Sequence, residues 1–457
     1  MLRQLVSIAL LVLLASCKED PANRKVVDAV SPAGHAFTFM PIIEDGVTDI
    51  TVTVAWPMNW AFDGSRNPAT PYVAAETLLS GGTKDLRPQD VLELFEDKNS
   101  YGHLSVRPDH AIGEVEFPKE YVDEVVDIVV EMLVRPQVTP EWLARVKDGM
   151  RANMEQARTQ SSNAMWSAAI LAILGDQPLR SYLNLPDLDQ IDAVTREDVL
   201  TWHKETLAQA NLTIAVTGAI SQADAGDVID RILAQLPKGD ATQLNPAPAN
   251  FSPRSILVHR PEAQKTSLAI IGQLPSTAEG GDLIDLLALE VFGQAGSGPL
   301  FDAVRTELRA SYGLQAGFSN YDRATRFMFI TGEVETTQLT AAKDVAIAAY
   351  REFRTNPNFD ALPNIQQATA DGTTKNVRSV NVVARTLLEL ALDGQDTALA
   401  PNLGDAIAAF SPEDIAARLR NSFPAAEDLM VFAVSPDANA LEGACVITQI
   451  EQALTCP

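Results

Sequence analysis

The stretch ELFEDKNSYG, Glu93 to Gly102, has a counterpart about 210 residues downstream, PLFDAVRTELRASYG, Pro299 to Gly313. In both, a Leu-Phe-acidic segment precedes the tripeptide Ser-Tyr-Gly. Internal repeats at a fixed offset indicate that one structural unit occurs twice in a chain. We therefore compared the flanks of the two stretches.

The flanks agree in type and in order. Each unit opens with an apolar strand-like run, continues past Ser-Tyr-Gly into an amphipathic helix, and later has an acidic helix-capping signature followed by a buried-looking strand. The paired segments are DITVTVAW (49–56) and TSLAIIG (266–272), TRED (195–198) and SPED (411–414), and LTIAVTG (212–218) and LMVFAVS (429–435). Duplication of an α+β unit explains this order better than chance.

Each unit combines strands joined by short connections with helices gathered between them. This pattern predicts an α+β fold, with two homologous domains that each have a mainly antiparallel sheet and helices packed on one face. The segment between the units is rich in Pro, Ala and Asn and lacks apolar periodicity. We predict a first domain over 30–236, a linker over 237–254 and a second domain over 255–457.

Composition narrows the class of protein. The 457 residues are 46% hydrophobic and 21% charged, as in an ordinary globular protein. The formal net charge is −25 and the basic residues form no run, which argues against nucleic acid because phosphate binding needs clustered Lys and Arg. We expect acidity to serve solubility.

The N-terminus has the pattern of an export signal. Arg3 precedes an apolar run, Leu5 to Ala15, that is shorter than the roughly 20 residues needed to span a bilayer. Small residues then lead into Cys17, and LLASCKED resembles the lipobox of bacterial lipoproteins. The resemblance implies a signal peptide over 1–17, a lipid anchor on Cys17 and a periplasm-facing position at the envelope, with the outer membrane favoured by Lys18.

The two remaining cysteines, Cys445 and Cys456, are close together near the C-terminus. An oxidising compartment would allow a short-loop disulfide between them, although the spacing alone does not decide whether they pair. Two cysteines do not make a zinc site.

The helix-like stretch TPYVAAETLLSGGT, Thr70 to Thr83, extends the comparison to a known family. Together with the duplicated units it resembles the pitrilysin/insulinase family of zinc metallopeptidases, in the branch of the mitochondrial processing peptidase. Catalytic members carry H-x-x-E-H on this helix, where two His bind zinc and the Glu acts as general base. On this sequence the motif falls on Val73, Glu76 and Thr77, so both His are missing.

The other possible ligands do not replace them. None of the five His are three or four residues apart. The family's third ligand, a Glu on a later helix, corresponds approximately to Glu155. The resemblance therefore implies no metal in this chain, with Glu76 a remnant that makes a hydrogen bond or an ion pair at the helix surface.

The second unit retains a different family feature. LFDAVRTELRASYGLQAGF, Leu300 to Phe318, resembles the segment that supplies an Arg/Tyr pair for holding the substrate backbone. On that match the pair is Arg305 and Tyr312, which can grip a peptide carbonyl with a guanidinium and a hydroxyl. From the residues alone, a surface ion pair of Arg305 with Asp302 or Glu307 is equally acceptable, and Arg309 is the rival arginine.

The resemblance implies a substrate-binding subunit without catalytic activity of its own. A sibling chain with an intact zinc motif would supply the zinc, and an unfolded peptide would be the substrate. The alternative is a catalytically dead scaffold or peptide-binding lipoprotein with no role in proteolysis.

Overall fold

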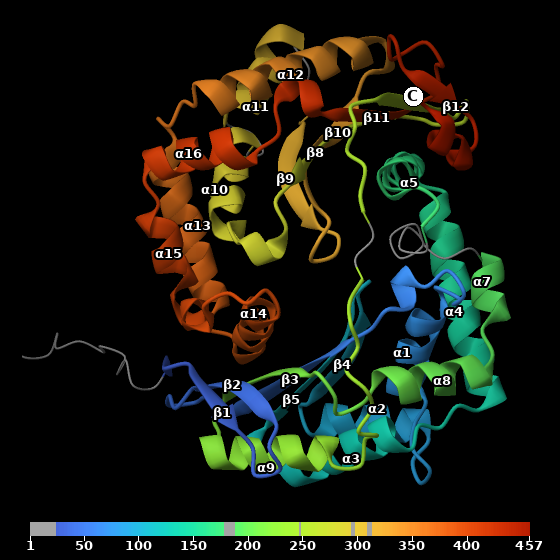
Figure 1. Cartoon of the computed structure of the whole chain (residues 1–457), viewed down its shortest axis with the longest axis vertical. Helices are drawn as coiled ribbons and strands as arrows, with labels where there is room; N and C mark the ends of the chain where they lie inside the picture. Colours follow the sequence, from blue (N-terminus) through green and yellow to red (C-terminus); the bar gives the residue numbers. More distant parts are fainter. Residues whose placement is uncertain (1–23, 178–187, 246–247, 294–297, 309–312) are drawn as a thin grey trace, which may run out of the picture.

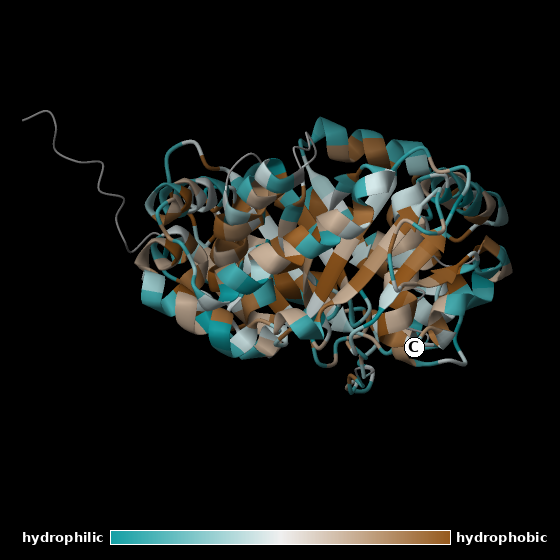
Figure 2. Cartoon of the chain, turned by 90° about the horizontal axis from the view of Figure 1, so that it is seen from above, coloured by the Kyte–Doolittle hydropathy of each residue, from teal (hydrophilic) through white to brown (hydrophobic). Residues whose placement is uncertain are grey.

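The chain folds into two similar halves that face each other, as Figure 1 shows. The computed structural model describes residues 24–177, 188–245, 248–293, 298–308 and 313–457. The two halves are joined by a segment whose described residues between 237 and 254 contain neither helix nor strand. Apolar segments gather in the interior and hydrophilic ones at the periphery (Figure 2).

The first half contains one six-stranded sheet and a set of helices. Its strands are β1 (Val27–Val30), β2 (Ala36–Pro41), β3 (Asp49–Pro57), β4 (Tyr101–Val106), β5 (His110–Pro118) and β6 (Thr213–Gly218). Its helices are α1 (Thr70–Ser80), α2 (Pro88–Asp97), α3 (Val122–Val134), α4 (Pro140–Arg158), α5 (Ser161–Leu174), α7 (Leu188–Ala193), α8 (Arg196–Thr206) and α9 (Gln222–Leu233).

The second half repeats this plan. Its strands are β7 (Ser255–His259), β8 (Thr266–Leu274), β9 (Gln315–Asn320), β10 (Arg326–Val334), β11 (Met430–Ser435) and β12 (Cys445–Ile447). Its helices are α10 (Asp282–Gly293), α11 (Gly298–Leu308), α12 (Leu339–Thr355), α13 (Leu362–Asn376), α14 (Val380–Leu392), α15 (Leu403–Ala409) and α16 (Pro412–Ser422), and a 3-10 helix, η8 (Ile450–Thr455), follows β12.

The two sheets share a five-strand topology. The first has the order β1-β2-β6-β3-β5-β4 and the second β12-β7-β11-β8-β10-β9. Strands β2 to β6 thus correspond one by one to β7 to β11, and only the outermost strand differs, since β1 precedes its unit and β12 follows it. Most neighbours are antiparallel, with parallel pairs at β2–β6, β7–β11 and β7–β12. The predicted fold class is confirmed.

The predicted helix starts near the end of each unit are present. Thr195 accepts from the backbone N–H of Asp198 while the Asp198 carboxylate accepts from the backbone N–H of Thr195. Ser411 and Asp414 make the same reciprocal cap at the start of α16. Because such caps are set by residues three apart, they can be read from the sequence.

Helix α14, which belongs to the second half, lies on the sheet of the first half (Figure 1). Its apolar residues form one buried cluster with Met40 of β2, Ile42 directly after β2, and Ala215 of β6. The sequence predicted helices on one face of each sheet. The opposite face is in fact covered in part by a helix from the other half.

Helix α5 makes the reciprocal contact. It belongs to the first half and packs on β7, β8 and β11 of the second sheet and on η8. Its residues from Ala168 to Leu174 are all buried, in the same cluster as Phe327 and Phe432 of the second sheet. The largest hydrophobic core is therefore shared by the two halves.

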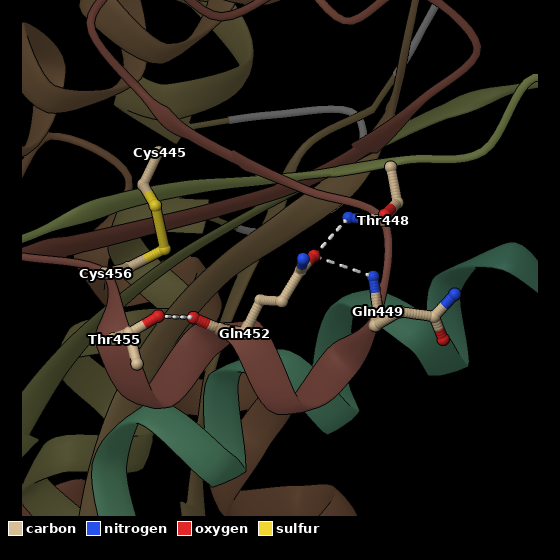
Figure 3. The surroundings of a disulfide bond; sticks show 6 residues. All are labelled: Cys445, Thr448, Gln449, Gln452, Thr455 and Cys456. Atoms are coloured by element: carbon tan, nitrogen blue, oxygen red, sulfur yellow. Dashed lines mark hydrogen bonds between the residues drawn. A yellow bond between two sulfur atoms is a disulfide. The ribbon is translucent and has the colours of Figure 1, made fainter.

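A disulfide holds the C-terminal segment beside α5. Cys445 on β12 and Cys456 after η8 are bonded, and Cys456 is buried in the cluster that contains α5 (Figure 3). The Gln452 side chain accepts from the backbone N–H groups of Thr448 and Gln449, which fixes the start of η8.

The contact of α14 with the first sheet should be measurable as stability. Leu387 on α14 is fully buried in that contact. We expect Leu387→Ala to lower the free energy of unfolding by about 2–5 kcal/mol, through lost apolar burial and the cavity left behind. Urea unfolding followed by circular dichroism measures the change. The matched control is Leu92→Ala on α2, where the leucine is 52% exposed and less than about 0.5 kcal/mol should be lost. Equal losses in the two variants would contradict this packing.

Candidate functional site: a groove beside β4

A groove of about 590 Å³ lies between α1, the edge strand β4 and α4. We call it the β4 groove. It is lined by Tyr72, Ala75, Glu76 and Ser80 of α1, by residues 103–106 of β4, and by Trp142, Arg145, Val146, Gly149, Met150 and Asn153 of α4. One of its walls is α1, the helix on which the sequence places the degenerate zinc motif.

The motif positions differ in what they face. Val73 and Thr77, which stand where the two His would be, are fully buried, and the Thr77 hydroxyl donates to the Val73 carbonyl oxygen at 2.6 Å. Glu76 is exposed and lines the β4 groove. No hydrogen bond or ion pair joins its carboxylate to another described residue, so the interpretation of Glu76 as a surface ion-pairing remnant is wrong.

The third-ligand position also differs from the sequence interpretation. Glu155 on α4 does not line the groove; its carboxylate lies 3.7 Å from the guanidinium of Arg151, one turn earlier. Asn153 occupies the groove wall instead. Among the described residues, no three His, Cys, Asp or Glu side chains are grouped so that they could hold a metal ion. The donors left around Glu76 therefore do not fit a catalytic zinc.

Besides Glu76, the groove is lined by aromatic side chains from α1 and α4 and by one arginine of α4. The indole N–H of Trp142 donates to the Ser80 hydroxyl at 3.3 Å, which orients the ring. The Arg145 guanidinium lies 5.1 Å from the centre of that ring. Burial raises the pKa of Tyr72, so its phenol stays protonated at any physiological pH. These groups offer aromatic faces and single charges of each sign, which suit binding of a peptide.

Strand β4 leaves one edge of its backbone open to the groove. Among the described strands it pairs with β5 alone, and the N–H of Arg107 donates to the His110 carbonyl oxygen at 2.8 Å in the connecting turn. Because hydrogen-bonded and non-hydrogen-bonded pairs alternate in an antiparallel ladder, the backbone groups of Gly102, Leu104 and Val106 point away from β5. They face the side on which another strand could be added.

The Arg/Tyr pair is only partly described. Arg305 lies on α11 and is exposed, with its guanidinium 5.7 Å from the centre of the Phe301 ring. It forms no ion pair with Asp302, Glu307 or any other described residue. Tyr312 and Arg309 lie outside the described residues, and so does Cys17. Convergence of Arg305 with Tyr312 thus stays a prediction.

The sequence did not point to the α4 side of the groove. Trp142 and Arg145 follow the Thr139 cap of α4 and read as ordinary helix residues. A cue was available in the Pro-Asp turn of residues 107–110, which predicts a hairpin and hence an edge strand nearby.

In the part of the chain that the structure covers, no helix is long and apolar enough to cross a bilayer.

Taken together, two duplicated α+β halves and a helix that has lost its metal ligands define a peptidase-like chain. Residues 193–368 match the family model described as the peptidase M16 inactive domain. No curated protein sequence matches the chain. That segment is less than half of the chain, and the likeness to solved structures shows the fold over nine tenths of it.

Three solved structures illustrate this likeness. The peptidase M16 inactive domain from Pseudomonas fluorescens is 17% identical with a TM-score of 0.80, over 90% of this chain and 98% of that one. A protease from Helicobacter pylori is 14% identical with a TM-score of 0.75, over 90% and 100%. The periplasmic protease PqqL from Escherichia coli is 12% identical with a TM-score of 0.70, over 95% of this chain but only 50% of PqqL. The predicted resemblance to the pitrilysin/insulinase, or M16, peptidases is confirmed, and at such identities the structural likeness establishes the fold alone.

The state of the motif positions predicts how the purified chain handles zinc. We expect the mature chain, loaded with zinc and dialysed, to retain far less than one equivalent of zinc. Val73 and Thr77 occupy the two His positions, and the α4 wall offers the amide of Asn153 rather than a carboxylate. Elemental mass spectrometry measures this, with an H-x-x-E-H relative treated in parallel as the positive control. One equivalent that survives dialysis would overturn the assignment of a degenerate site.

Proposed function

We propose that this chain is the non-catalytic, substrate-binding subunit of a heterodimeric zinc metallopeptidase that acts on unfolded peptides in the bacterial envelope. The observation that carries the proposal is the β4 groove. It joins a free strand edge to a helix that has kept Glu76 and lost both positions for metal-binding His.

The groove supports peptide binding by strand addition. An extended segment placed beside β4 would pair with the outward backbone groups of Gly102, Leu104 and Val106. Main-chain pairing of this kind gives affinity with little dependence on sequence. Trp142 and Tyr72 would then contact the side chains that point from the added strand into the groove. An unfolded peptide fits this site because its backbone is free to pair.

The length of related chains supports a two-chain enzyme. This chain covers half of PqqL, and a structure described as the first half of PqqL matches 95% of it with a TM-score of 0.69. A sibling of the same fold could supply the other half. It would bring the zinc and the general base, while Arg305 and Tyr312 of this chain would hold the peptide backbone. The export signal and Cys17 support a lipid-anchored position facing the periplasm.

The decisive experiment is purification of the tagged chain from its native envelope, followed by a cleavage assay on unfolded peptides. We expect cleavage that a zinc chelator abolishes and that the chain alone does not show. Cleavage by the isolated chain would refute a non-catalytic role. A partner-bound preparation without chelator-sensitive cleavage would favour the alternative, a scaffold or peptide-binding lipoprotein.

The role of the β4 edge can be tested by removing one outward N–H. The fold should tolerate Val106→Pro, because the N–H of Val106 points away from β5 and makes no hydrogen bond to that strand. We expect at least about tenfold weaker binding of an unstructured fluorescent peptide, measured by anisotropy on the isolated chain. Val106→Ala, which keeps the N–H, is the matched control and should bind nearly as well as the parent. Equal affinities in the two variants would exclude strand addition at β4.

The role of Arg305 can be tested in the reconstituted pair. Arg305→Ala and Tyr312→Phe should each lower kcat/KM by at least about tenfold, roughly 1.4 kcal/mol of transition-state stabilisation. The control is Arg351→Ala on α12, which removes another exposed arginine of the second half. If both site variants keep full activity while the control also does, Arg305 and Tyr312 have no part in catalysis.

A further inference from the structure

Two hairpin turns, one from each half, meet in the interior of the molecule. The turn between β4 and β5 comes from the first half, and the turn between β9 and β10 reaches toward it from the second (Figure 1). The end of α14 lies beside them. We call the charged residues gathered there the tip cluster: Arg107, Asp109 and His110 of the first half, and Asp322, Arg323, Glu389 and Asp393 of the second.

Arginines make the contacts between the two halves in this cluster. Arg107 bonds Glu389 at 2.6 Å, and the Nε of Arg323 lies 3.6 Å from Oδ2 of Asp109. Arg323 also binds the α14 carboxylates, with Glu389 at 2.9 Å and Asp393 closer still. The tip cluster is thus held by guanidinium–carboxylate contacts that cross the interface.

The centre of the cluster is buried and incompletely bonded. Asp109, His110 and Asp322 are each about 5% exposed. Nδ1 of His110 lies 3.3 Å from Oδ1 of Asp109, and Nε of Arg323 lies 3.6 Å from Oδ2 of Asp109, but neither contact has good hydrogen-bond geometry. Oδ2 of Asp322 has no hydrogen-bond partner among the described residues. The Asp322 Oδ1 is satisfied, since it accepts from the N–H groups of Ala324 and Thr325 at 2.7 and 2.6 Å. Buried polar atoms without hydrogen-bond partners lower the stability of the fold. A proton bound to one of these atoms would supply a missing donor at this place.

The charges at this place do not balance. Two guanidinium groups face four carboxylates, and the neighbouring polar groups, Thr277 and Tyr321, add hydroxyls without charge. The Thr277 hydroxyl already donates to Asp393 at 2.6 Å. Leaving His110 aside, the cluster has two more carboxylates than guanidinium groups in a mostly buried site, where like charges repel strongly.

We propose that the tip cluster is an acid-strengthened latch between the two halves. A proton from solvent binds Oδ2 of Asp322 without breaking any bond, removes one surplus negative charge and supplies a donor among the unpartnered acceptors of the cluster. The contact between the β4–β5 and β9–β10 turns then tightens.

The direction in which the pKa of the Asp322 carboxyl is shifted agrees with this geometry. Burial raises the pKa of Asp322, the amides of Thr325 and Ala324 oppose that shift, and the charge of Asp109 adds to it. A carboxyl whose pKa is raised by folding costs stability while ionised, so stability increases as the pH falls through its folded value.

Asp109 behaves in the opposite way. Burial alone would raise its pKa, but His110, whose Nδ1 lies 3.3 Å from Oδ1 of Asp109, and the charge of Arg323 outweigh burial and lower it. Its contribution is present above the ordinary Asp value of about 3.9 and is lost as the pH falls below that, through its folded value. The latch should therefore strengthen from neutral pH toward mild acid and fail in strong acid.

The inference goes beyond peptide binding and does not depend on it, since the test needs no peptide. The structural link to the groove is that β4 is part of the latched hairpin. Any change in the latch reaches the strand that borders the β4 groove.

Asp322→Asn tests the latch on the intact mature chain. The Asn carbonyl can still accept from Ala324 and Thr325, and its amide places a permanent donor where the proton would bind. At pH 7.5 we expect amide hydrogen exchange of residues 106–112, in the other half, to slow by at least about threefold. The melting temperature should rise by about 1–2 °C, and the difference from the parent should shrink as the pH falls through the raised pKa of Asp322. The parent itself should show slower exchange at pH 5 than at pH 7.5, after correction for the intrinsic rate.

The control variant is Asp45→Asn, an exposed carboxyl between β2 and β3 that should change neither measurement. Two outcomes would overturn the latch: exchange at 106–112 that Asp322→Asn leaves unchanged, or a melting temperature that it lowers at every pH. If Asp322→Asn fails to fold, the exchange of the parent at the two pH values decides alone, and equal corrected rates would refute the proposal.

Discussion

The structure depends on one reciprocal contact, in which each half lends a helix to the sheet of the other. Helix α14 covers part of the first sheet and α5 covers the second. The central strand β3 shows why such a cover is needed, because Ile50 and Val52 on one face and Thr51 and Ala55 on the other are all buried. A sheet that is apolar on both faces needs a layer on each. Since that layer comes from the other half, neither half can complete its core alone.

The two sheets differ in what their inner faces carry. On β10 the inner face presents Phe327 and Phe329, which pack against Phe251 of the linker and Trp166 of α5. On β5 it presents Glu114 and Glu116. Arg385 of α14 binds Glu114 at 2.5 and 2.6 Å, while burial, followed by the charge of Asp49, raises the pKa of Glu116. The inner face of the first sheet is thus partly polar and is bound through an ion pair with α14, whereas that of the second sheet is packed through aromatic contacts.

The sequence revealed what is encoded within a few residues. The apolar runs of β3 and β8 and the Thr195 and Ser411 caps predicted the duplicated unit, because each is recognisable from a few neighbouring residues. The exchange of α5 and α14 was not predictable in this way, since an apolar helix face does not specify which sheet it covers. Glu76 was expected to find a partner on its own helix surface and instead faces the groove. Glu155 was the approximate position given to the third ligand, but Asn153, two residues earlier and therefore about 200° away around the helix, lines the groove instead.

The burial of Val73 and Thr77 bears on how far this chain stands from a zinc enzyme. Both side chains are enclosed by their neighbours, so two imidazoles placed there would have to displace packed atoms, and a close-packed interior resists this. Asn153 would still leave the metal one carboxylate short. A peptide held beside β4 would thus meet Glu76, Arg145 and aromatic faces, but neither of the two His that would hold a metal on this helix. Interactions equal in the ground and transition states give affinity without rate. The groove is therefore suited to holding a chain, and under the proposed function cleavage would have to be supplied by chemistry outside it.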